Sequence, residues 1–80
     1  MKKTGKQSTH FVVCLNNEGY GASLEVGKLY RALPDKEAAA HGLIRVVDES
    51  GEDYAFAVDR FHPVELPPVV EKALLAASNL

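Results

Sequence analysis

The side chains in this sequence that could do chemistry are a cluster of acids, three histidines and one cysteine. The acids flank a Ser-Gly pair and are Asp48, Glu49, Glu52 and Asp53. Carboxylates gathered in one loop can bind Ca²⁺, but an EF-hand loop needs oxygens at alternate positions and a closing glutamate, and this spacing does not supply them. We therefore interpret residues 48–53 as a hairpin tip whose charges oppose pairing with other strand edges.

The histidines and the cysteine show no local metal-binding spacing. His10, His41, His62 and Cys14 form neither a C-x-x-C pair nor an H-x₃-H pair. If the first and last strands pair, His10 and His62 converge, but two ligands make a poor zinc site. Cys14 lies in an apolar run, where a thiol acts as a small hydrophobe rather than a nucleophile. We therefore expect no enzymatic activity, no metal and no cofactor.

Composition predicts one small globular domain in a reducing compartment. The chain has 80 residues, 46% of them apolar, and a formal net charge of −2. A chain this short has a thin core. The single cysteine allows no internal disulfide, which fits a cytoplasmic protein. No apolar run approaches the length of a membrane span, and because the N-terminal residues lack an apolar stretch we expect no signal peptide.

The pattern of apolar, glycine and proline residues predicts a mainly β domain between two end segments. Residues 1–9 are a polar tail, residues 10–66 a small β-barrel and residues 67–80 a C-terminal helix. Strands are expected at residues 10–15, 28–33, 43–48, 53–58 and 62–66. Pro34 suits the first position of a helical turn that Gly42 ends. Pro63 restricts the last strand to a sheet edge.

The central hairpin has a predicted register but two candidate core faces. A turn centred on Ser50-Gly51 would place Val47 opposite Tyr54 and Arg45 opposite Phe56. One face of the hairpin is then large and aromatic, and the other pairs large with small residues. A single bulge would exchange the two faces, so the sequence leaves the core face open.

This order of elements resembles the Src-homology-3-like small barrel: a strand, a long loop, a strand, a connector, a hairpin, a one-turn corner and a last strand. The sharpest likeness is Ser50-Gly51-Glu52-Asp53-Tyr54-Ala55-Phe56, followed by Asp59-Arg60-Phe61-His62-Pro63. The resemblance implies five strands and core positions for Phe56 and Phe61. The stretches at residues 24–30 and 47–54 also resemble small bacterial and phage-encoded barrel proteins.

The chain departs from the adaptor domains of that family at their ligand site. Those domains hold proline-rich peptides with an exposed Trp and several Tyr residues. This chain has no Trp, and its corner carries Val58-Asp59-Arg60. Tyr20 remains a candidate recognition residue because it lies between two glycines in a long loop, where tyrosines often contact partners. The alternative is that Tyr20 folds back over the end of the domain.

We expect a protein-interaction module, monomeric or weakly dimeric, with an unidentified protein partner. The expected partner-binding residues lie in the first loop and the adjacent connector and are Asn17, Glu18, Tyr20, Asp35 and His41. The rival function is nucleic-acid binding through the tail and two strand cations: Lys2, Lys3, Lys6, Lys28 and Arg31. The C-terminal helix, with its stripe of Val70, Leu74 and Ala77, is either a lid or an interface.

Overall fold

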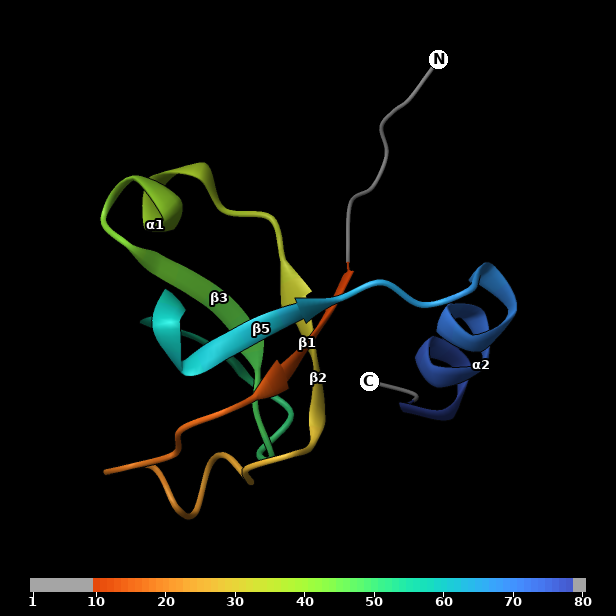
Figure 1. Cartoon of the computed structure of the whole chain (residues 1–80), viewed down its shortest axis with the longest axis horizontal. Coiled ribbons are helices and arrows are strands. Elements are labelled where there is room, and N and C mark those ends of the chain that lie inside the picture. The colour runs from red at the N-terminus through yellow and green to blue at the C-terminus, as the bar shows by residue number, and fades with distance from the viewer. Residues whose placement is uncertain (1–9, 79–80) are drawn as a thin grey trace.

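The computed structural model describes residues 10–78 and shows a mainly β fold with a C-terminal helix (Figure 1). The strands are β1 (His10–Cys14), β2 (Leu29–Leu33), β3 (Leu43–Val47), β4 (Asp53–Ala57) and β5 (Phe61–Val64). The helical segments are α1 (Lys36–Ala40), the one-turn 3₁₀ helix η2 (Val58–Arg60) and α2 (Pro68–Ser78). The predicted tail at residues 1–9 lies outside the described residues.

The five strands form one antiparallel sheet in the order β4-β3-β2-β1-β5. The mainly β prediction with five strands and a C-terminal helix is confirmed. Among the described residues, β4 and β5 are the two edges and each pairs with a single neighbour, so the hydrogen-bonded sheet is not closed. Pro63 lies in the edge strand β5, as its missing N–H requires.

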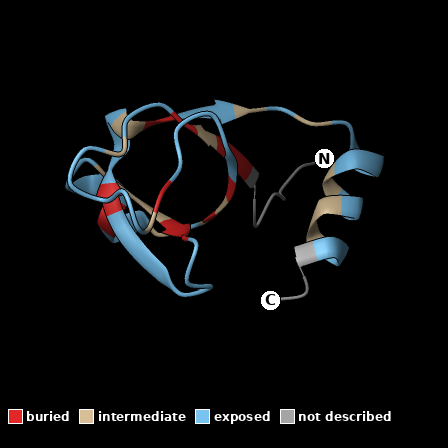
Figure 2. Ribbon diagram, turned by 90° about the horizontal axis from the view of Figure 1, so that it is seen from below, coloured by how far each residue is buried: buried red, intermediate tan, exposed pale blue. Residues whose placement is uncertain are grey.

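The core lies on one face of the sheet, which curls around it (Figure 2). Side chains alternate between faces along a strand, so Val12 and Cys14 point inward together from β1. The buried cluster is completed by Leu24, Tyr30, Ala32, Val46, Phe56 and Phe61. Burial of Phe56 and Phe61 matches the expectation drawn from the Src-homology-3 resemblance.

The predicted register of the hairpin is wrong by one residue. Val47 lies opposite Asp53, and Arg45 lies opposite Ala55. The turn spans residues 48–51, closed by a bond from the Gly51 N–H to the Asp48 carbonyl, and Gly51 has a φ of 87°. This left-handed residue adds one position to the loop, since the next backbone bond runs from the Asp48 N–H to the Glu52 carbonyl. The shift places Phe56 on the core face.

The connector is helical for five residues, from Lys36 to Ala40. Asp35 is its N-cap, since its carboxylate accepts a bond from the Ala38 N–H at 3.0 Å. Pro34 therefore precedes the cap, and its predicted place at the first helical position is wrong. Gly42 ends the helix as predicted, with a φ of 73° that a residue with a Cβ rarely adopts.

The C-terminal helix α2 stands to one side of the sheet (Figure 2). From Pro68 to Ala77 it has no fully buried residue, and Val69 and Val70 are exposed. Within residues 10–78, no helix is long and apolar enough to cross a membrane.

Candidate partner-binding site

Tyr20 lies against the core rather than projecting freely from its loop. Its ring meets the Phe56 ring edge-to-face, with centroids 5.1 Å apart, and the Arg60 guanidinium lies 4.7 Å from its centroid. The residue is nevertheless 41% exposed. Tyr20 is thus a fixed aromatic surface with one face supported and part of the ring open to solvent. The ring thus folds back against the core, as one reading of the sequence expects, and the role of Tyr20 in recognition stays a prediction.

The first loop is held together by polar contacts of the neighbouring predicted site residues. Asn17 donates from its side-chain amide to the Leu24 carbonyl at 3.0 Å, and the Glu18 N–H donates to the Asn16 side chain. Leu24, only 1% exposed, anchors the loop in the core. Asn17 therefore positions the loop, and Glu18 leaves its exposed carboxylate at the surface.

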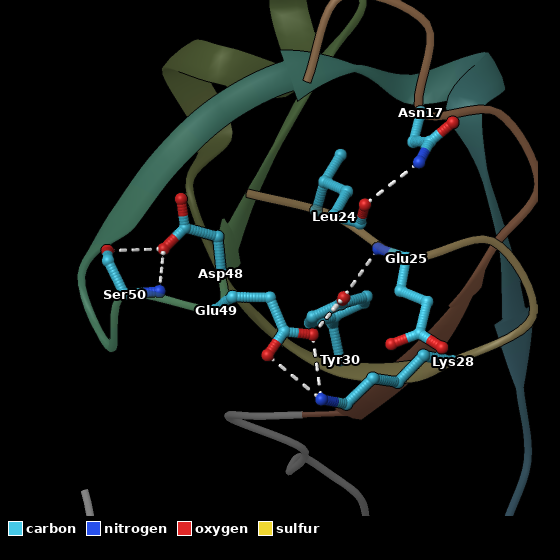
Figure 3. Close-up of polar contacts among 8 residues, drawn as sticks. All are labelled: Asn17, Leu24, Glu25, Lys28, Tyr30, Asp48, Glu49 and Ser50. Atoms are coloured by element: carbon cyan, nitrogen blue, oxygen red, sulfur yellow. Dashed lines mark hydrogen bonds and ion pairs between the residues drawn. The ribbon is translucent and has the colours of Figure 1, made fainter. Parts of the chain in front are cut away.

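The hairpin tip is bound to this loop through the Tyr30 hydroxyl (Figure 3). That hydroxyl accepts a bond from the Glu25 N–H and donates to the Glu49 carboxylate. Lys28 pairs with the same carboxylate at 2.7 Å, and the Glu49 N–H donates to the Ser23 carbonyl. Asp48, which is buried, accepts bonds from Ser50 within the turn. The acidic tip therefore also connects the hairpin to the first loop. We call the contacts of Glu49 with Tyr30, Lys28 and Ser23 the joint.

These contacts shift the pKa values of the joint in opposite directions. The hydrogen bond from Lys28, followed by that from Tyr30, holds the pKa of the Glu49 carboxyl below its ordinary value. Burial, followed by the bond to Glu49, raises the pKa of the Tyr30 hydroxyl. The folded protein therefore favours an ionised Glu49 and a neutral Tyr30.

Replacing Glu49 should make the stability of the protein less dependent on pH in the acid range. A carboxyl whose pKa is lower in the folded state stabilises the fold above its unfolded pKa, and this contribution is lost as the pH falls through the folded pKa. We expect the urea midpoint of the parent to fall from about pH 5 downward. Glu49→Gln should start lower at pH 6 and decline less.

The matched control is Glu18→Gln, because the Glu18 carboxylate is exposed and bonds to no side chain of the described region. Its urea midpoint should follow the parent at every pH. A Glu49→Gln profile parallel to that of the parent would contradict the assignment of Glu49 to this joint.

Asp35 and His41 lie together in a shallow depression of about 200 Å³. The depression is lined by α1, by β3 and by Ala55 of β4. Asp35 binds the Arg45 guanidinium at 2.8 Å, and Arg45 also reaches Asp53 at 3.2 Å. The Ala38 N–H, followed by Arg45, holds the pKa of Asp35 below its ordinary value. Arg45 is thus neutralised by two carboxylates.

The edge strand β4 connects these two predicted surfaces. Phe56 supports Tyr20, and its neighbour Ala55 borders the depression with Asp35 and His41. Consecutive residues of a strand face opposite sides of the sheet. The predicted site residues therefore flank the same edge strand on its two faces, and they do not form one continuous patch.

A larger hollow of about 380 Å³ separates α2 from the outer face of the sheet. Leu74 and Ala77, two of the predicted stripe residues, line it from the helix. Phe11 and Val47 line it from the sheet and are buried, although they point away from the core. Leu74 and Ala77 of the stripe therefore turn toward the sheet.

The backbone register of β1 and β5 does not place His10 and His62 opposite each other. His62 lies opposite Val13, three residues beyond His10 along β1. Among the described residues, no group of three His, Cys, Asp or Glu side chains could hold a metal ion.

Sequence reasoning missed two residues that shape this surface. Leu24 was assigned no role, because a lone leucine in a glycine-rich loop carries no periodic signal. Arg60 stacks on Tyr20 although 40 positions separate them in the chain. A contact of that kind follows from the fold and has no local sequence pattern.

Comparisons with known proteins give no family assignment. A scan against protein-family models, a search of curated proteins and a search of solved structures found no match to this chain.

Proposed function

We propose that this protein is a non-enzymatic protein-interaction module whose partner docks beside β4. The observation that supports this most is Tyr20, a partly exposed aromatic ring held on a rigid support by Phe56 and Arg60. Aromatic and arginine side chains are enriched among residues that dominate binding energy. A ring that is already fixed loses little conformational freedom when a partner covers it.

Further exposed apolar residues near this ring extend the proposed surface. Tyr54 shares the core-side face of β4 with Phe56, since the two are separated by two positions. Val58 opens the following η2 turn, which also contains Arg60. Tyr54 and Val58 are both about half exposed. An apolar surface edged by charged groups is the usual character of a recognition site.

The proposal includes a small barrel of the Src-homology-3 type in the cytoplasm. The strand order, the curled sheet and the η2 turn between β4 and β5 support the barrel. The unpaired thiol of Cys14, buried in the core, supports a reducing compartment. A bacterial or phage origin rests on the sequence resemblance alone.

Replacing Tyr20 should weaken partner binding more than it weakens the fold. We expect peptides selected from a random display library to bind Tyr20→Ala more than fivefold less tightly, which is about 1 kcal/mol. The ring pair with Phe56 is worth about 0.5–1.5 kcal/mol, so the variant should remain folded. Affinity by fluorescence polarisation and stability by urea unfolding check the two effects separately.

The matched control is Val26→Ala, which removes a more exposed side chain from the same loop. It should bind selected peptides as the parent does. The proposed surface would be contradicted if the selection enriched no peptide. It would also be contradicted if selected peptides bound Tyr20→Ala and the parent equally.

The rival function, nucleic-acid binding, has weaker support. Lys2, Lys3 and Lys6 lie outside the described residues. Lys28 is held by Glu49, which cancels its charge locally. Arg31 points to the outer face of the sheet, beside the hollow under α2. These two strand cations therefore give little support to a phosphate-binding surface.

A further inference from the structure

The outer edge of β4 carries a defined set of backbone hydrogen-bonding groups. Backbone bonds join Asp48 to Glu52 at one end of the hairpin and Gly42 to Val58 at the other. In an antiparallel ladder, residues alternate between bonding to the partner strand and pointing away from it. Tyr54 and Phe56 therefore bond to β3. The N–H and C=O groups of Asp53, Ala55 and Ala57 point outward, and within residues 10–78 β4 pairs with no second strand.

This edge is protected by charge only at its hairpin end, where β4 begins with Asp53. Natural edges are blunted by prolines, lysines or bulges. The opposite edge strand, β5, contains Pro63. From Tyr54 to Ala57, β4 has neither a proline nor a charged residue. The outward residues Ala55 and Ala57 are small and exposed, so a second backbone can approach closely.

We propose that the β4 edge accepts an extended peptide as an additional strand, with apolar and basic side chains in alternation. This inference rests on the proposed function and names its partner class. Strand addition obtains affinity from main-chain bonds and specificity from the two flanking faces. Because side chains of the added strand alternate, its two sides meet different surfaces of this protein.

The core-side face of the edge fits apolar side chains. It presents the half-exposed Tyr54, and Phe56 on the same face of β4 supports the ring of Tyr20. Apolar side chains of the added strand would cover both rings. This explains why two aromatic residues are kept partly exposed on one side of β4.

The other face fits basic side chains. It presents the depression that contains Asp35, Glu37 and Arg45 beside Ala55. Arg45 is already paired with Asp35 and Asp53, whereas the exposed Glu37 carboxylate pairs with no side chain of the described region. The unbalanced charge of this face is negative, so lysine or arginine is its complement.

A proline at position 57 tests the inference with little risk to the fold. Ala57 has a φ of −58°, which matches the angle that a proline ring imposes, and its N–H points away from β3. Ala57→Pro therefore removes one outward donor and no ladder bond. The matched control is Ala57→Ser, which keeps the N–H.

The probe is an acetylated octapeptide of alternating valine and lysine, titrated by NMR into each variant. The parent should bind it with the largest amide shifts at Asp53, Ala55 and Ala57. Ala57→Pro should bind at least tenfold more weakly, Glu37→Gln several-fold more weakly, and Ala57→Ser within twofold of the parent.

The outcomes separate this inference from the proposed function. Failure of the octapeptide to bind the parent, or equal binding by Ala57→Pro, overturns strand addition. Equal or tighter binding of a valine–glutamate octapeptide overturns the basic specificity. Concentration-dependent dimerisation that Ala57→Pro abolishes would assign the edge to a second copy and overturn the peptide as occupant. Library peptides that depend on Tyr20 but tolerate Ala57→Pro would leave the proposed function standing without this inference.

Discussion

Phe56→Ala should remove most of the stability of the protein at 25 °C and leave a measurable unfolded fraction. Phe56 is 4% exposed and packs against two rings, Tyr20 at 5.1 Å and Phe61 at 5.9 Å between centroids. Removing a buried phenylalanine costs about 3–5 kcal/mol, because transfer energy and contacts with the cavity wall are both lost. A domain of this size has a total stability of about 5 kcal/mol. Circular dichroism and amide dispersion in NMR spectra measure the folded fraction.

The control for Phe56→Ala is Tyr54→Ala, two residues earlier on the same face of β4. Tyr54 is 47% exposed, and its hydroxyl bonds to the exposed Glu52. Its truncation should cost less than about 1 kcal/mol and leave a cooperative urea transition. A Phe56→Ala protein as stable as Tyr54→Ala would mean that the core does not centre on Phe56.

The hairpin shows how far sequence patterning reaches in this chain. Both strands were located to within one residue, because alternation and turn residues are local signals. The register of the two strands was not predicted correctly, because one left-handed glycine, Gly51, decides the length of the turn. The sequence allows Ser50-Gly51 either as the centre of a two-residue turn or as the end of a longer one. Packing of Phe56 against Phe61 favours the second.

The acidic tip illustrates a second limit. Four acids around a Ser-Gly pair indicate a solvated turn. Here Asp48 is buried as the cap of the turn, and Glu49 meets Tyr30 and Lys28 across the sheet. Those partners lie 19 and 21 positions away, so no local pattern could identify them.

The sequence identified single candidate site residues, but it did not predict how they are arranged in space. Glycines on both sides of Tyr20 marked it as unusual, and the connector chemistry marked Asp35 and His41. The relation between them depends on β4 lying between the two surfaces. Phe56 and Ala55 lie on opposite faces in any register, but the register decides that Phe56 shares its face with Ile44 and Ala55 shares its face with Arg45.

Leu24→Ala should be the most destabilising change outside the strands. Leu24 is 1% exposed and belongs to the core cluster although it lies in the first loop. Truncation of a buried leucine costs about 2–5 kcal/mol. The loop that carries Tyr20 would lose its main anchor, because the remaining bond from Asn17 to the Leu24 carbonyl does not bury apolar surface. Urea unfolding measures the loss.

The local consequence of Leu24→Ala distinguishes an anchor from an ordinary core residue. Because Leu24 is the point where the loop enters the core, the amides of Tyr20, Ser23 and Leu24 should lose hydrogen-exchange protection before those of β1 and β2. Val26→Ala, two residues later and 54% exposed, should change neither the urea midpoint nor this protection. If Leu24→Ala lowers the hydrogen-exchange protection of all amides equally, the first loop unfolds together with the rest of the domain. The anchoring of the loop that carries Tyr20 would then belong to the whole sheet and not to Leu24 in particular.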